Sequence, residues 1–251
     1  MHKTISSKSI GNWSCKDSNV DLVRQDISLD PLARNVVIYA LGKTNPRTEI
    51  SELNWINFEL PVQILTMLED FDSLFVTFGS ALESLAIYGE NKYLSSKKRY
   101  RDLVETREKS RYLHFQLNTI YGGLNNHSHM LLGQLQEAIE NKREIELSSG
   151  NQIREYHHID DLIIPLVERI QSIDACGIQQ LNHGSSITIR EMTQSVMERF
   201  GLEHVLKFNT LADPKEDNYN VRPDKTAFLE HSYFRDTVSG IYDYLNERVR
   251  R

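Results

Sequence analysis

Three residues with the chemistry of proton transfer, Ser80, Tyr93 and Lys97, lie close together in the sequence. The spacing of Tyr93 and Lys97 places a phenol and an ammonium on one helix face. A free tyrosine, with a pKa of about 10, is a poor acid or base at neutral pH, and a neighbouring ammonium favours its phenolate. The set predicts that Tyr93 exchanges a proton, that Lys97 lowers the tyrosine pKa, and that Ser80 hydrogen-bonds to the reacting oxygen, with Thr77 as the alternative hydroxyl. The opposing interpretation is a solvated helix pair and a turn-forming serine.

The elements expected around this set form one βαβ unit. An apolar run over residues 72–80 predicts a buried strand, and a charged stretch over 92–109 predicts the helix that carries the pair. A second apolar run over 112–118 predicts the next strand. Parallel sheets place their chemistry at the carboxyl ends of such strands, where Ser80 and Asn118 fall.

Further segments occur in a set order, over residues 23–27, 36–42, 55–57, 117–122 and 149–162. The last is the most distinctive, because it places Gly150, Gln152 and Arg154 ahead of the pair Asp160 and Asp161. With the Ser/Tyr/Lys set, these segments resemble the extended short-chain dehydrogenase/reductase family, which includes nucleotide-sugar epimerases, dehydratases and 4-keto reductases. The likeness extends over most of the chain.

The resemblance implies an enzyme that uses NAD or NADP and acts on a nucleotide-activated sugar. The residues implied in cofactor binding are Asp26, Ile27, Ala40, Leu41, Gly42, Asn57, Tyr93, Lys97 and Tyr121. Those implied in substrate binding are Thr77, Asn118, Arg154 and Arg222. The two arginines are expected at the diphosphate, because a guanidinium pairs bidentately with phosphate oxygens, although either could instead form a surface ion pair.

The expected fold class is α/β, a Rossmann-like parallel sheet that is N-terminally incomplete, with a smaller C-terminal substrate-binding lobe. Residues 1–123 with 155–183 are expected to form the cofactor domain, and 124–154 with 184–251 the lobe. The family opens with a strand and a Gly-x-x-Gly-x-x-Gly turn that binds the cofactor pyrophosphate at a helix N-terminus. No such spacing occurs in this sequence, so we expect dinucleotide binding to be weak.

The opening strand of this fold lies at the centre of the sheet, where a missing neighbour would leave backbone groups unpaired. Three arrangements would avoid that cost. Residues 1–20 supply a replacement strand, the strands near Ile27 and Ile38 pair directly, or a second subunit covers the gap, as in a homodimer.

The composition is ordinary for a globular chain of 251 residues, with 39% apolar and 25% charged residues. A net charge of −6 gives no electrostatic reason to expect a nucleic acid partner. The sequence has no apolar run of about 18 residues and no signal-peptide core, so no membrane partner and a cytoplasmic location are expected. Cys15 and Cys176 are then expected to be reduced.

No metal site is expected. His157 and His158 are adjacent and point away from each other, and His127 and His129 have no third ligand at a recognisable spacing.

Three functional classes remain open. The first is an NAD(P)-dependent enzyme acting on a nucleotide-activated deoxysugar for surface polysaccharide biosynthesis. The second is a catalytically silent homologue that retains sugar-nucleotide or partner binding, which the absent glycine turn favours. The third is a reductase of a non-sugar carbonyl compound.

Overall fold

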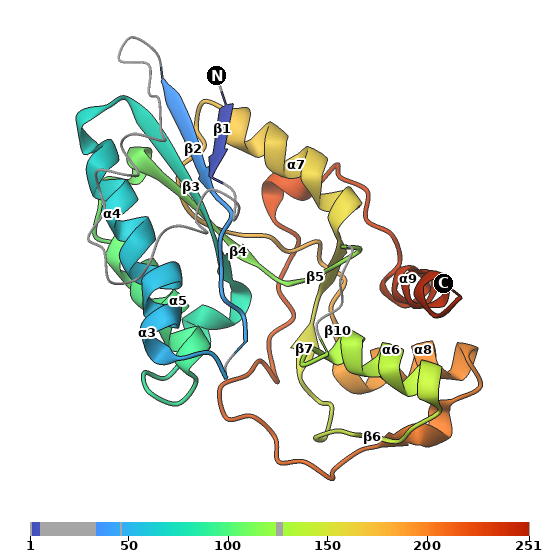
Figure 1. The fold of residues 1–251 in the computed structure, drawn as a ribbon. Helices are drawn as coiled ribbons and strands as arrows, with labels where there is room; N and C mark the ends of the chain where they lie inside the picture. The colour runs from blue at the N-terminus through green and yellow to red at the C-terminus, as the bar shows by residue number, and fades with distance from the viewer. Residues whose placement is uncertain (1, 6–33, 46, 124–127, 251) are drawn as a thin grey trace. The chain divides into compact units, whose positions relative to one another are not determined.

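The computed structural model describes residues 2–5, 34–45, 47–123 and 128–250. The expected strand at 23–27, with the implied cofactor-binding residues Asp26 and Ile27, lies outside these residues. The chain forms two compact units (Figure 1). The first consists of Met1–Leu117 and Ile170–Gln180, and the second of Asn118–Arg169 and Leu181–Arg251.

The first unit is built on a five-stranded parallel sheet with the strand order β1-β2-β3-β4-β9. The strands are β1 (His2–Ile5), β2 (Asn35–Tyr39), β3 (Ser73–Ser80), β4 (Tyr112–Leu117) and β9 (Gly177–Gln180). The first five residues of β3 and of β4 are all buried, as expected for strands covered on both faces. The parallel Rossmann-like sheet predicted from the sequence is therefore confirmed.

Strand β1 pairs in parallel with β2, from His2 opposite Val36 to Ile5 opposite Tyr39. This is the first of the three expected arrangements, because residues from the segment 1–20 supply the neighbour of β2. The backbone groups along that edge of β2 thereby gain partners.

The helices α3, α4 and α5 of this unit lie on one face of the sheet (Figure 1). The helical elements are α3 (Ile50–Asn54), η1 (Trp55–Glu59), α4 (Leu60–Met67), η2 (Leu68–Asp70), η3 (Ala81–Leu85), α5 (Lys92–Val104) and η4 (Lys109–Arg111). Their apolar faces share one core with the sheet, which includes Trp55, Ile64, Phe75, Tyr100 and Val104. The helix predicted over 92–109 ends at Val104, because the residues from 105 to 110 are exposed and offer no apolar side chain to the core.

The second unit has short two-stranded sheets and four longer helices. Its strands pair as β5 (Thr119–Tyr121) with β8 (Tyr156–His158), β7 (Ile153–Arg154) with β10 (Ile187–Thr188), and β6 (Ile145–Glu146) with β11 (Leu206–Lys207). Its helical elements are α6 (Leu131–Asn141), α7 (Ile159–Gln171), α8 (Ile189–Arg199), η5 (Glu203–Val205), η6 (Ala227–Leu229) and α9 (Thr237–Val249). Helices α6, α8 and α9 share a core that includes Leu135, Met192, Val196, Ile241 and Leu245. Thr188 and Glu191 form a capping box at the start of α8, as their spacing predicts.

The boundary between the units differs from the predicted domain division. The sequence-based division assigns residues 118–123, 155–169 and 181–183 to the cofactor domain, whereas in the structure they belong to the second unit. The reason is local pairing: β5 pairs with β8 in a separate sheet and not with the five-stranded one. Among the described residues, no helix is both long and apolar enough to cross a bilayer.

Candidate active site

Tyr93 and Lys97 lie one turn apart on α5, whose N-terminus is capped by Asn91 accepting the Leu94 N–H at 3.1 Å. The Lys97 side chain is buried, and its Nζ donates a 2.8 Å hydrogen bond to the Phe78 carbonyl of β3. The helix thus delivers an ammonium to the carboxyl end of the strand that Ser80 closes. The spacing that predicts a shared helix face is realised, and the pair is not a solvated one.

Ser80 and Glu83 form a capping box at the start of η3. The Ser80 Oγ accepts the Leu82 N–H at 3.2 Å, and the Glu83 carboxylate accepts the Ser80 N–H at 3.0 Å. The Ser80 side chain also lies close enough to the Tyr93 hydroxyl to lower its pKa. Ser80 therefore connects a fixed turn to the tyrosine, as the proposed acid–base set requires.

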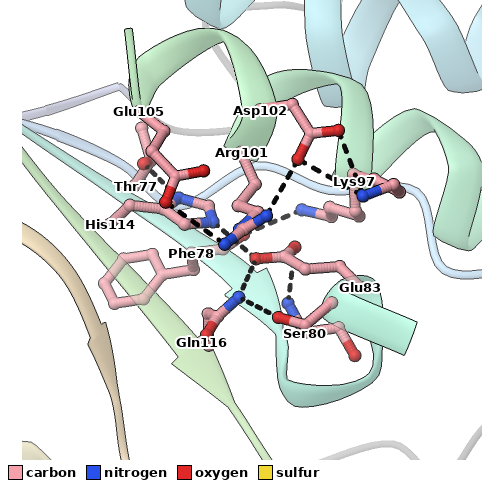
Figure 2. Close-up of polar contacts among 12 residues, drawn as sticks. Thr77, Phe78, Ser80, Glu83, Lys97, Arg101, Asp102, Glu105, His114 and Gln116 are labelled. Carbon is pink, nitrogen blue, oxygen red and sulfur yellow. Dashed lines mark hydrogen bonds and ion pairs between the residues drawn. The ribbon is translucent and has the colours of Figure 1, made fainter. Parts of the chain in front are cut away.

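Glu83 is a fully buried carboxylate at the centre of this network (Figure 2). Besides the Ser80 N–H it contacts His114 Nε2 at 2.8 Å and accepts from Gln116 Nε2 at 2.9 Å, both on β4. Burial alone would raise the pKa of Glu83, but these hydrogen bonds and the His114 charge lower it below its usual range. His114 Nδ1 in turn lies 2.8 Å from Thr77 Oγ1. The alternative hydroxyl, Thr77, is thus engaged deep in the network.

Gly79 makes room for this buried pair. A Cβ at Gly79 would lie 2.4 Å from Glu83 Oε2 and 2.4 Å from His114 Nε2, closer than side-chain carbons approach other atoms. A glycine is therefore required between β3 and the turn at Ser80.

The two candidate proton-transfer groups have shifted pKa values. Burial, and then the Glu83 carboxylate, raises the pKa of Tyr93 to about 12, while the hydrogen bond from Ser80 acts in the opposite direction. Burial lowers the pKa of Lys97 to about 8, opposed by Glu83. The expected lowering of the Tyr93 pKa by Lys97 is not found: burial and Glu83 raise this pKa, and Ser80 is the group that lowers it.

Asn57 connects α5 to the segment that follows β2. It lies in the π-helical turn η1, a type of turn found often at functional sites. Its Oδ1 accepts the Lys43 N–H at 3.0 Å, and its Nδ2 donates at 3.0 Å to the Lys43 carbonyl and to Ser96 Oγ. Ser96 Oγ donates at 2.7 Å to the Tyr93 carbonyl. A predicted cofactor residue thereby fixes the backbone of the catalytic candidate.

Gly42 leaves an open position beside the Lys97 ammonium. A Cβ there would lie 3.5 Å from Lys97 Nζ and 3.8 Å from Asn57 Oδ1, an ordinary contact that would fill the space next to both groups. Ala40 and Leu41 precede it immediately after β2, and Leu41 packs against the core of the unit. These predicted cofactor residues are all in the first unit.

Of the predicted substrate residues, Thr77 lies in the first unit, whereas Asn118, Arg154 and Arg222 lie in the second, and the two arginines already have partners. Arg154 forms a bidentate pair with Asp217, at 2.5 and 2.6 Å, in which the Asp217 side chain is buried. Arg222 is more than half exposed, donates to the Ser186 carbonyl and lies 4.0 Å from Glu191. The Arg154 guanidinium can reach a phosphate only by exchanging its carboxylate partner, whereas Arg222 is open to solvent.

Asn118 lies directly before β5 of the second unit, and Tyr121 is the last residue of that strand. The Asn118 amide donates to the Leu181 carbonyl at 2.7 Å and to Asn182 Oδ1 at 3.0 Å. The Tyr121 ring packs edge-on against His158, and burial raises the pKa of its hydroxyl above its usual range. The Tyr121 hydroxyl has no hydrogen-bond partner among residues 34–45, 47–123 and 128–250.

The sequence analysis missed Glu83 and its β4 partners. Two signals were present: Ser80 and Glu83 have capping-box spacing, and His114 and Gln116 alternate on one face of a predicted strand. A polar pair inside an otherwise apolar strand requires a polar partner, and Glu83 is that partner.

Structural comparison gives relatives over almost the whole chain. The dTDP-glucose 4,6-dehydratase of Bacillus anthracis, solved with NAD, superposes with a TM-score of 0.71 at 13% identity, over 93% of this chain and 78% of that one. The UDP-glucuronic acid 4-epimerase of Bacillus cereus, solved with UDP-glucuronic acid and NAD, gives 0.73 at 15% identity, over 94% and 80%. The ADP-L-glycero-D-manno-heptose-6-epimerase of Helicobacter pylori gives 0.67 at 16% identity, over 92% and 76%.

The chain has the fold of these nucleotide-sugar dehydratases and epimerases. No protein-family model and no curated protein matches its sequence. The fold expected from the sequence motifs is thus confirmed by structure, at identities too low to transfer a specific activity.

Proposed function

We propose that this protein is an NAD(P)-dependent oxidoreductase or epimerase that acts on a nucleotide-activated sugar, with Ser80, Tyr93 and Lys97 as its acid–base set. The observation that carries the proposal is the arrangement of these side chains at the carboxyl end of β3, with Lys97 buried and Ser80 and Tyr93 half-buried. That edge of a parallel sheet is where α/β folds bind their ligands.

The residues of the first unit fit the ribose of a nicotinamide nucleotide. The open space at Gly42 lies beside the Lys97 ammonium, which has three donors, and the Phe78 carbonyl is its one acceptor among the described residues. Ribose hydroxyls would accept from the remaining donors. When bound, the cofactor supplies or accepts the hydride.

The protein's own residues would handle the accompanying proton. Tyr93, which its high pKa keeps protonated at neutral pH, donates from its hydroxyl to the substrate oxygen during reduction. The Ser80 hydrogen bond and the positive charge of Lys97 then favour the phenolate that remains. Glu83 holds the Ser80 turn in place and opposes early ionisation of Tyr93.

In the second unit, Arg222 and Asn118 would bind the substrate's diphosphate and sugar, and Tyr121 would border the cofactor. Arg154 would join them after releasing Asp217. Neighbours of the same fold were solved with UDP-glucuronic acid or UDP-glucose, together with NAD. Sugar nucleotides of this kind feed surface polysaccharide biosynthesis, the setting we propose for this protein.

A second candidate function is sugar-nucleotide binding without catalysis. The sequence contains no Gly-x-x-Gly-x-x-Gly turn, the element whose amides would bind the cofactor pyrophosphate. A protein without this turn would bind NAD(P) weakly, and its second unit would still bind a sugar nucleotide.

The test compares the wild-type chain with Tyr93→Phe, which removes one hydroxyl. We measure oxidation of reduced cofactor with a keto-sugar nucleotide, and sugar-nucleotide binding by calorimetry. Turnover should fall by roughly 100-fold or more, the loss of a general acid, while binding is unchanged. A variant that keeps the wild-type rate would refute the assignment. Binding with no turnover in the wild type would instead select the second candidate.

A further inference from the structure

The second unit contains a buried cluster of one carboxylate and two imidazoles that the proposed reaction does not use. Glu155 lies between β7 and β8, His157 lies in β8, and His183 lies in the segment after β9. All three are buried, and one potential ligand atom of each lies within 4.8 Å of the others. Glu155 and His157 are two residues apart, and the fold brings His183, 26 residues further along the chain, to them.

The carboxylate is held rigidly by the backbone. Glu155 Oε2 accepts the His183 N–H at 2.7 Å, and Oε1 accepts the Gly184 N–H at 3.1 Å and the Ser186 hydroxyl at 3.3 Å. These contacts fix the direction of the carboxylate relative to the two rings. Preorganisation of this kind is what orients the ligands of a metal site.

The cluster carries a negative charge with little to balance it. Hydrogen bonds and the two imidazoles hold the pKa of Glu155 below its usual range against the effect of burial, so the carboxylate is ionised. Burial lowers the pKa of His183, which therefore retains a proton poorly near neutral pH. Over residues 34–45, 47–123 and 128–250, the ion-pair partners of Glu155 are these histidines, with no Lys or Arg.

The ring nitrogens are partly unused. His183 Nε2 and His157 Nδ1 are buried without a hydrogen-bond partner in the part of the chain that the structure describes. His183 Nε2 lies 4.0 Å from Glu155 Oε2, and His157 Nε2 lies 3.4 Å from the same oxygen. Two nitrogens thus face one carboxylate oxygen.

We propose that Glu155, His157 and His183 bind a divalent transition metal ion, with Zn²⁺ as the best match. Two imidazoles and one carboxylate are a common zinc ligand set, and they do not suit Mg²⁺ or Ca²⁺, which require oxygen ligands. Metal–ligand bonds of about 2.1 Å in a tetrahedron separate the ligand atoms by about 3.4 Å. The 3.4 Å separation meets this value, and the 4.0 Å separation reaches it with a small side-chain movement.

His183 also lines a cavity of about 440 Å³ within the second unit, together with Ser186, Lys225 and Phe234. His183 Nε2 is itself covered, so an ion or a water ligand entering from this cavity would reach it after a small movement of the ring. The Phe234 ring stacks on His183, with ring centroids 5.1 Å apart, so one side of the site is apolar. An apolar surround strengthens metal–ligand electrostatics.

One contact competes with the metal. His183 Nδ1 accepts the Ser185 N–H at 3.2 Å, which places the proton of the neutral ring on Nε2. Coordination through Nε2 requires the other tautomer of the neutral ring, in which this one proton lies on Nδ1, and it therefore breaks this long hydrogen bond.

The sequence analysis did not identify these ligands, because it considered only histidines that are close to each other in the sequence. His157 and His158 do point away from each other along β8, as predicted. The partners of His157 are instead Glu155, two positions before it and just ahead of β8, and His183.

The experiment uses the full chain, stripped with chelator and titrated with Zn²⁺ and with Co²⁺. We expect about one equivalent of metal, a micromolar or tighter Kd, and a Co²⁺ absorption spectrum of tetrahedral type. His183→Leu should weaken Zn²⁺ binding at least 100-fold. His231→Gln, at an exposed histidine of the same unit, should leave it unchanged.

Thermal unfolding is a second measurement, and it still distinguishes the variants if one of them folds poorly. Saturating Zn²⁺ should raise the Tm of the wild type and of His231→Gln, and should not raise that of Glu155→Gln. Stoichiometry below about 0.1, or equal binding by all variants, would overturn the proposal and leave the cluster as a proton-sharing network. Neither measurement involves dinucleotide or sugar nucleotide, so the outcome is independent of the proposed activity.

Discussion

Replacing Lys97 with Met should remove a charge that destabilises the folded protein. The buried ammonium has its pKa lowered from 10.5 to about 8, chiefly by burial. This difference corresponds to about 3 kcal/mol of unfavourable free energy below pH 8, because folding disfavours the charged form. The lost hydrogen bond to the Phe78 carbonyl offsets about 2 kcal/mol of it. At pH 7, Lys97→Met should therefore be as stable as the wild type or more stable by about 1 kcal/mol.

The pH dependence gives the sharper test. Between pH 8 and 10.5 the unfolded wild type binds more protons at Lys97 than the folded protein, so the free energy of unfolding rises with pH. From pH 7 to 9.5 the rise should be about 2 kcal/mol from this residue. Tyr93, with its pKa raised to about 12, lowers stability only above pH 10 and does not enter this range.

Urea unfolding of both proteins between pH 7 and 9.5 measures this difference. The wild-type curve should rise relative to that of Lys97→Met by about 2 kcal/mol. Lys92→Met, an exposed lysine of the same helix, should follow the wild type. Parallel curves for the wild type and Lys97→Met would show that burial does not lower the pKa of Lys97, and would refute the role proposed for Lys97 beside Tyr93.

Two further predictions concern packing around the sites. Gly79→Ala places a methyl group against the buried Glu83 pair and should lower the free energy of unfolding by about 2 to 3 kcal/mol in urea titrations, whereas Gly123→Ala, which meets no atom within 4 Å, should not. Asp217→Asn leaves the Arg154 guanidinium without its buried carboxylate partner and should lower the free energy of unfolding by about 3 kcal/mol. Glu144→Gln, which removes an exposed ion pair, should lower it by less than about 0.5 kcal/mol. Equal losses in the two variants would contradict this account.

The parts of the fold that follow from local sequence were predictable. Strand β3 is an apolar run that ends in Gly79 and Ser80, and α8 begins at the Thr188 capping box. Both signals act within a few residues, so the elements form where the sequence indicates. The pair Tyr93 and Lys97 also depends only on helical spacing, and the structure places both at the end of β3.

The remaining features depend on residues distant in sequence. Glu83 is buried because β4 delivers His114 and Gln116 to it, and Arg154 is neutralised by Asp217 across 63 positions. Neither partner can be identified from spacing alone. The division between the units also depends on distant residues. A three-residue strand such as β5 can pair with either of two sheets, and packing decides which.

The π-turn at Trp55–Glu59 fixes the number of residues that the helical segment around Asn57 must contain. The Leu60 N–H bonds to the Trp55 carbonyl five residues back, so this turn holds one residue more than the α-helix on either side. One residue corresponds to about 100° of rotation. Deleting one residue here would restore regular α-helical hydrogen bonding, but it would rotate one part of the helix relative to the other. Either Asn57 would turn away from Lys43, or Leu60 and Ile64 would turn away from the sheet. The number of residues in this helix is therefore set by two requirements at once, the position of Asn57 and the packing of the residues that follow it.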